Sequence, residues 1–64
     1  MHNFKKDDKV KYIPRHANGD KNHIDCEEGI VSSINDAFVF VRYSRNGILQ
    51  QTAQATNPDN LILI

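Results

Sequence analysis

The chain has 64 residues, enough for one small domain. Its eight basic and eight acidic side chains give a formal net charge of zero, so it lacks the basic excess typical of proteins held to nucleic acid mainly by phosphate contacts. A single cysteine excludes an internal disulfide, and the absence of a CxxC pair removes the usual sign of a structural zinc site.

The N-terminal segment, residues 1–7, is polar apart from Phe4, and we expect it to be flexible. It contains no apolar run typical of a secreted protein, and the lone thiol suits a reducing compartment, which together favour a cytoplasmic location. The longest apolar run, residues 61–64, is far too short to span a bilayer, so we expect no membrane partner.

The first predicted strand covers residues 9–13, where Val10 and Tyr12 alternate with lysines, as in a half-buried strand. Pro14 ends this strand because proline cannot donate to a strand ladder. Residues 14–27 show no strand or helix period, and a loop of this length in so small a domain is often functional.

The centre of the chain predicts a meander of strands. Residues 29–35 form the second predicted strand, and Asn35-Asp36 the turn that follows it. Residues 37–43, "AFVFVRY", give the strongest strand signal in the chain. Asn46-Gly47 is a strong signal for a two-residue hairpin turn.

The C-terminal part predicts a polar fourth strand at residues 48–56, one 3₁₀ turn at 57–60 and a short fifth strand at 61–64. No stretch of ten residues has the pattern of a capped amphipathic helix. We therefore expect an all-β, five-stranded barrel or sandwich that occupies residues 1–64 as a single domain. The predicted core is Val10, Tyr12, Val31, Ile34, Val39, Val41, Leu61 and Leu63.

Two resemblances add to this reading. "DKVKYIP", "EGIVSSI" and "FVFVRY" are similar to the DxVxY…GxVxxI…VxV run of KOW-like members of the SH3-like barrels. That resemblance implies a long RT-type loop after the first strand and a 3₁₀ turn before the last. "YIPRHANGDKNHIDCEEGIVSSIND", "VFVRY" and "ATNPDNL" resemble small proteins of phages and bacterial prophages, which implies an intracellular setting but no particular activity.

The loop sequence "RHANGDKNHIDCEEG", residues 15–29, holds the residues with the most chemistry. His16, His23 and Cys26 are of the types that bind zinc, and an acid beside them would supply a fourth ligand, although their spacing matches no strong zinc motif. The alternative is that the histidines organise the loop through hydrogen bonds while Cys26 packs as a small apolar residue.

Catalysis by Cys26 with His23 as its base is disfavoured. Asp25, Glu27 and Glu28 crowd the thiol, and their negative charges oppose formation of a thiolate. We therefore expect that the chain is not an enzyme, has no catalytic residue and binds no cofactor.

The strongest strand is apolar on both faces. If Val39 and Val41 point inward, Phe38, Phe40 and Arg42 form an outward contact surface, because aromatic residues and arginine dominate interface hot spots. The opposite register would bury both phenylalanines and leave the valines outside. A second alternative is that the long loop folds over the phenylalanines.

Three functions remain open, and the first is a non-catalytic protein-interaction adaptor whose partner is another protein or a second copy of this chain. Its expected surface combines the loop with the third strand: His16, Asp20, His23, Asp25, Glu28, Phe38, Phe40 and Arg42. The second is nucleic-acid binding through Lys9, Lys11, Arg15, Arg42 and Tyr43. The lysines and arginines would contact phosphates, and the tyrosine ring would stack on a nucleobase. The third is metal binding through His16, His23 and Cys26.

Overall fold

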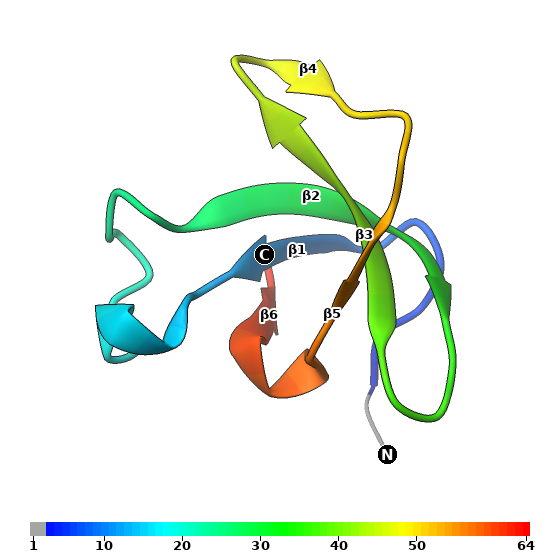
Figure 1. Ribbon diagram of the computed structural model, residues 1–64, viewed down its shortest axis with the longest axis horizontal. Helices are drawn as coiled ribbons and strands as arrows, with labels where there is room; N and C mark the ends of the chain where they lie inside the picture. The colour runs from blue at the N-terminus through cyan, green and yellow to red at the C-terminus, as the bar shows by residue number, and fades with distance from the viewer. Residues whose placement is uncertain (1–2) are drawn as a thin grey trace.

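The computed structural model describes residues 3–64, which contain six strands, two 3₁₀ turns and no α-helix. The elements in chain order are β1 (Lys9–Tyr12), η1 (Arg15–Ala17), β2 (Glu27–Ile34), β3 (Val39–Arg45), β4 (Ile48–Leu49), β5 (Gln54–Thr56), η2 (Pro58–Asn60) and β6 (Leu61–Leu63). They form one antiparallel sheet in the order β4-β3-β2-β1-β6, and β5 also pairs with β3 (Figure 1). The described residues contain no helix long or apolar enough to cross a membrane.

The predicted fourth strand, residues 48–56, is wrong as a single strand. It is divided into β4 and β5, which pair with different parts of β3: Ile48 lies opposite Arg45, while Gln54 lies opposite Val41. The chain between them bends at residues 51–52, where polar side chains have no apolar face to bury. The sheet therefore has six strands in place of the five expected.

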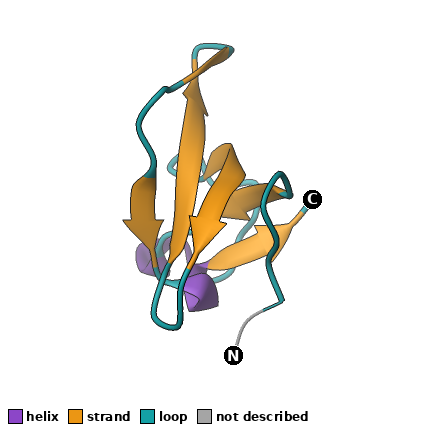
Figure 2. Cartoon of the chain, turned by 90° about the vertical axis from the view of Figure 1, so that its right-hand side faces the viewer, coloured by secondary structure: helices purple, strands orange, loops and turns teal. Residues whose placement is uncertain are grey.

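Hydrogen bonding does not close the sheet. In residues 3–64, β5 and β6 form no ladder with each other and are connected only through η2. The two 3₁₀ turns lie at the same end of the sheet, where the backbone N–H of Ile13 donates to the carbonyl of Asn60, while the β3–β4 hairpin extends to the opposite end (Figure 2). An open seam on the inner face of the sheet results.

The interior consists of side chains that the period-two pattern places on one face. Val10, Val31, Val39, Val41, Tyr43 and Leu61 form the buried cluster, with Tyr12 and Phe4 packed against it. Tyr43 and the buried Thr56 were not predicted as core residues. Both lie on the inward-facing parity of their strands, since Thr56 is opposite Val39.

Two predicted core residues are wrong. A bulge between Val31 and Ser33 returns Ile34 to the inner face opposite Val39, but its place at the end of β2 leaves it 44% exposed. Leu63 pairs with Val10 in the ladder, yet it is 57% exposed because β6 is an edge strand next to the end of the chain.

Gly29 occupies the point where β2 lies between β1 and β3. A Cβ atom at this position would meet the carbonyl oxygen of Arg42 at 2.6 Å and Cγ1 of Val41 at 2.7 Å. No residue larger than glycine fits there without movement of β3, so glycine is what lets these strands approach so closely.

The predicted turns are confirmed. Asn46 and Gly47 both have positive φ, 55° and 78°, as a type I′ hairpin turn requires. Asn35 Oδ1 accepts hydrogen bonds from the backbone N–H groups of Ala37 and Phe38. η2 starts with a proline, and the side chain of Asn57 caps it by accepting from Asp59 N–H.

The N-terminal segment, expected to be flexible, makes defined contacts from Phe4 onward. Phe4 packs against the core cluster, and the backbone of residues 7–8 exchanges hydrogen bonds of 2.8 and 2.9 Å with Val31. These contacts extend the pairing of β2 beyond β1. Positions 1 and 2 of the segment lie outside the described residues.

Candidate functional site

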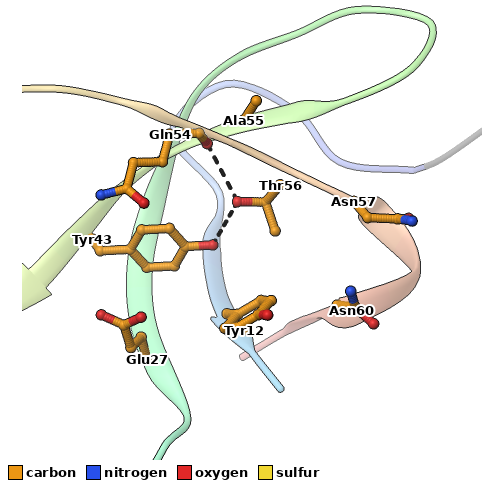
Figure 3. Close-up of a pocket in the computed structure, with 8 residues that line it drawn as sticks. All are labelled: Tyr12, Glu27, Tyr43, Gln54, Ala55, Thr56, Asn57 and Asn60. Carbon is orange, nitrogen blue, oxygen red and sulfur yellow. Dashed lines mark hydrogen bonds between the residues drawn. The ribbon is translucent and has the colours of Figure 1, made fainter. Parts of the chain in front are cut away.

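A pocket of about 330 Å³ lies at the open seam of the sheet, between β1, β3, β5 and η2 (Figure 3). Its walls carry two phenol rings, three carboxamides and one carboxylate, which belong to Tyr12, Tyr43, Gln54, Asn57, Asn60 and Glu27. The inward parity of the strands places these side chains there: Tyr12 is opposite Glu27 in the ladder of β1 and β2, and Gln54 of β5 is opposite the buried Val41 of β3. The pocket is therefore the place where the inner face of the sheet opens to solvent.

The floor of the pocket is fixed by a short chain of hydrogen bonds. The phenol oxygen of Tyr43 lies 2.7 Å from Oγ1 of Thr56, which in turn donates to the carbonyl of Gln54 at 3.3 Å. The ring of Tyr12 meets that of Tyr43 edge-on, with centroids 6.2 Å apart. The Tyr43 ring is therefore fixed by its hydrogen bond with Thr56 and by its edge contact with Tyr12.

Burial raises the pKa of the Tyr43 phenol above 10.0; its hydrogen bond with Thr56 partly offsets this shift, and the negative charge of Glu27 adds to it. Glu27 itself pairs with Arg45, whose Nε lies 3.3 Å from Oε1. The pocket thus presents phenols and amides beside one carboxylate, that of Glu27, which is paired with Arg45. Its chemistry is hydrogen bonding to polar groups of a ligand.

The loop between β1 and β2 is ordered by successive turns. The N–H groups of Asp20, His23 and Cys26 each donate to the carbonyl three residues earlier. His16, in η1, is anchored beside the buried Ala17. These turns bring His16, His23 and Asp25 together, with one ligand atom from each within 4.8 Å of the others.

The predicted metal set of His16, His23 and Cys26 is corrected by this geometry. The Cys26 thiol points to the carbonyl of Asp20, to which it donates at 3.3 Å, and it is not a member of the cluster. Asp25 takes its place, because Oδ2 of Asp25 lies 2.7 Å from Nε2 of His16. Residue spacing could not show this, since side-chain directions in an irregular loop follow no period.

The outward face of β3 matches the first of the two registers considered. Val39 and Val41 are buried, while Phe38 is 43% exposed and Phe40 is half-buried on the other side. Arg42 also lies on that side, but its Nε donates to the carbonyl of Gln50 and ties down the chain between β4 and β5.

The loop and this outward face do not form one surface, so the composite interaction surface predicted above is wrong. The loop enters β2 at Glu27, whereas Phe38 precedes the residue that pairs with Ile34 at the other end of β2. An eight-residue strand separates these ends by roughly 20 Å. They lie on opposite sides of the molecule (Figure 1).

The two other acids predicted for this surface have partners of their own. Asp20 Oδ1 accepts a hydrogen bond from Asn22 N–H, and Glu28 pairs with Lys11 at 3.6 Å.

The five residues predicted for nucleic-acid binding are not brought to one face either. Lys9 and Arg42 flank Ile30 across the outer face, and Arg15 lies off the sheet in η1. Lys11 donates to the carbonyl of Lys21 as well as pairing with Glu28. Tyr43 is only 4% exposed on the opposite, inner face and offers no ring for base stacking.

The sequence reasoning missed the pocket. Tyr12 was expected only as a core residue, and Gln54, Asn57 and Asn60 were not singled out. The inward parity of Tyr12 was a usable signal. The seam that exposes it depends on β5 and β6 remaining unpaired, and no local pattern reports that.

Comparisons with protein-family models, with curated proteins and with solved structures gave no match to this chain.

Proposed function

We propose that the chain is a non-catalytic protein-interaction module, an SH3-like barrel that binds a short segment of a partner protein in the seam pocket. The observation that carries the proposal is the pocket itself, which is lined by the partly exposed ring of Tyr12 and by three carboxamides. Such a mixture of aromatic surface and polar groups suits a peptide, which offers side chains and backbone amides together.

The strand order supports the SH3-like assignment. A meander of β2, β3 and β5 is flanked by β1, which also pairs with β6, and a single 3₁₀ turn connects β5 to β6. The long loop after β1 and the 3₁₀ turn before β6 agree with what the resemblance to KOW-like barrels implies. The likeness to phage and prophage proteins, and with it a cytoplasmic setting, stays a prediction.

The pocket chemistry favours a peptide over a phosphate-bearing ligand. No lysine, arginine or histidine lines the pocket, so it lacks the cationic groups that hold a phosphate. Asn60 and Gln54 present carboxamides, each of which offers two donor hydrogens and an acceptor oxygen. These are the groups that pair with a peptide backbone.

A peptide display selection against the folded chain tests the proposal. We expect selected peptides to bind the chain and to lose about fivefold in affinity for Gln54→Ala and for Asn60→Ala, since one hydrogen bond contributes about 1 kcal/mol. Gln51→Ala, which removes a carboxamide at an exposed position outside the pocket, is the matched control and should bind like the wild type. Selected peptides that ignore both pocket variants, or a selection that enriches none, would contradict the proposal.

The partner class includes a second copy of this chain, because Ile24, Ile48 and Ile64 are apolar and more than half exposed. Sedimentation of the purified chain separates the two cases. A monomer at all concentrations leaves a different protein as the partner, whereas a dimer disrupted by Asn60→Ala assigns the pocket to self-association.

A further inference from the structure

We propose that the loop between β1 and β2 is a binding site for one divalent transition-metal ion of the zinc type, held by His16, His23 and Asp25. This site is separate from the seam pocket, and its argument does not depend on the proposed function. It differs in its third ligand from the site that residue types alone predicted.

The three side chains already surround one point in space. Oδ2 of Asp25 lies 2.7 Å from Nε2 of His16 and 4.0 Å from Nδ1 of His23. A tetrahedral zinc ion with bonds of about 2.0–2.1 Å keeps its ligand atoms roughly 3.3 Å apart. The first separation must therefore widen and the second narrow, each by less than about 1 Å. The two imidazole nitrogens lie within 4.8 Å and must also reach that spacing, which rotation of the exposed His16 and Asp25 and the partly exposed His23 permits.

The backbone holds the ligands in place without the ion. The turn that ends in Cys26 N–H→His23 carbonyl spans Asp25, and His16 is fixed in η1 by Ala17 N–H→Pro14 carbonyl. The two imidazole rings stand 5.3 Å apart at 80° to one another. Little loop entropy remains to be lost on binding, which favours affinity.

The donor set selects the class of metal. Two imidazole nitrogens and one carboxylate oxygen suit zinc and its neighbours, whereas calcium and magnesium require six or more oxygen ligands or retained waters. Three protein ligands leave a fourth position for water or for a group of a bound partner. The site is therefore an open one.

One existing contact opposes binding. The backbone N–H of Asp25 donates to Nδ1 of His23 at 3.0 Å, and a metal at that nitrogen displaces this hydrogen bond. The simpler role for Asp25 is to orient His16 within the loop, with no ion involved. The two roles differ in one measurable respect, which is saturable binding of zinc.

Titration calorimetry distinguishes metal binding from a purely structural role of Asp25. The titrant is zinc sulfate in a non-chelating buffer, and the ¹⁵N chemical shifts of the imidazoles are a second readout. We expect one zinc per chain, perturbation of the His16 and His23 ring nitrogens, and a loss of affinity of about tenfold or more in His16→Ala and in Asp25→Asn. Cys26→Ser is the matched control within the loop, and His2→Ala, which lies outside the described residues, excludes binding at the N-terminus. Both should retain the wild-type affinity, and circular dichroism confirms that each variant is folded.

Three results would overturn the proposal: no saturable zinc binding by the wild type, binding that survives in folded His16→Ala, or binding that requires Cys26. Equal affinity for magnesium and zinc would overturn the assigned class of metal.

Discussion

The hydroxyl groups of Tyr43 and Thr56 meet at 2.7 Å inside the sheet and tie β3 to β5 at the floor of the seam pocket. Both residues are buried, so neither hydroxyl has ready access to water as a substitute partner. The same pair thus stabilises the fold and shapes the site.

Removal of either hydroxyl is expected to destabilise the chain. Tyr43→Phe should lower the free energy of unfolding by about 1 kcal/mol, and Thr56→Val by a similar amount, because each leaves a buried polar group without its partner. In the double variant the losses should be less than additive by about 0.5 kcal/mol or more. Urea denaturation of the four proteins measures this cycle, and strict additivity would mean that the two hydroxyls do not interact.

Stability should also fall at high pH through Tyr43. Burial raises the pKa of this phenol, so the folded chain holds the proton more tightly than the unfolded chain, whose phenol titrates near 10.0. The contribution is complete below pH 10 and is lost as pH rises from there through the folded pKa. Wild type should therefore lose stability above about pH 10 more steeply than Tyr43→Phe.

The pKa of Tyr43 can be measured directly in Tyr12→Phe. The chain has two tyrosines, so this variant keeps Tyr43 alone. Its tyrosinate absorbance should appear above pH 10.0 in the folded protein. A midpoint at or below 10.0 in the folded variant would refute the raised pKa.

A charged residue on the inner face of β3 should unfold the chain, but one at the exposed position just before this strand should not. Val41 is fully buried, and Val41→Asp would bury a carboxylate at a cost comparable to the whole stability of a chain this size, about 3–10 kcal/mol. We expect that variant to be unfolded. Phe38→Asp, on the exposed side, should retain a cooperative melt by circular dichroism; the reverse pattern would show that the register of β3 is inverted.

Gly29→Ala is expected to cost about 1–3 kcal/mol, because the added methyl group has to push β3 away from β2. Ser33→Ala, at an exposed position of the same strand, is the control and should change stability by less than about 0.5 kcal/mol. Thermal melts compare them. Equal melting temperatures for the two variants would mean that the close approach at Gly29 relaxes at no cost.

Nucleic-acid binding is expected to be absent, since Tyr43 is buried and Arg42 is engaged with Gln50. Fluorescence anisotropy with a labelled single-stranded oligonucleotide at low salt provides the measurement. Affinity that falls steeply with salt and is weakened by Lys9→Gln and Arg15→Gln would establish the nucleic-acid alternative in its place.

Local features of the fold were predictable from the sequence because they depend on neighbours in the chain. Alternation around Val10 indicated which side chains of β1 face inward, and Asn46-Gly47 indicated the hairpin through its tolerance of positive φ. Alternation could not choose the inner face of β3, because both faces of residues 37–43 are apolar. The 3₁₀ turn followed from a proline placed directly after a capping asparagine.

Only the tertiary structure decided which inward-facing side chains are covered and which line an opening. Tyr43 and Leu63 both face inward, but Tyr43 lies in β3, which is paired on both sides, and is 4% exposed, whereas Leu63 lies in the edge strand β6 and is 57% exposed. That difference arises from the pairing of distant segments. In the loop, Asp25 faces His16 while Cys26 turns away, because each side-chain direction follows from the sequence of turns and not from spacing. Alternation is a property of each strand by itself, whereas the seam, its pocket and the histidine–aspartate cluster exist only once the strands have met.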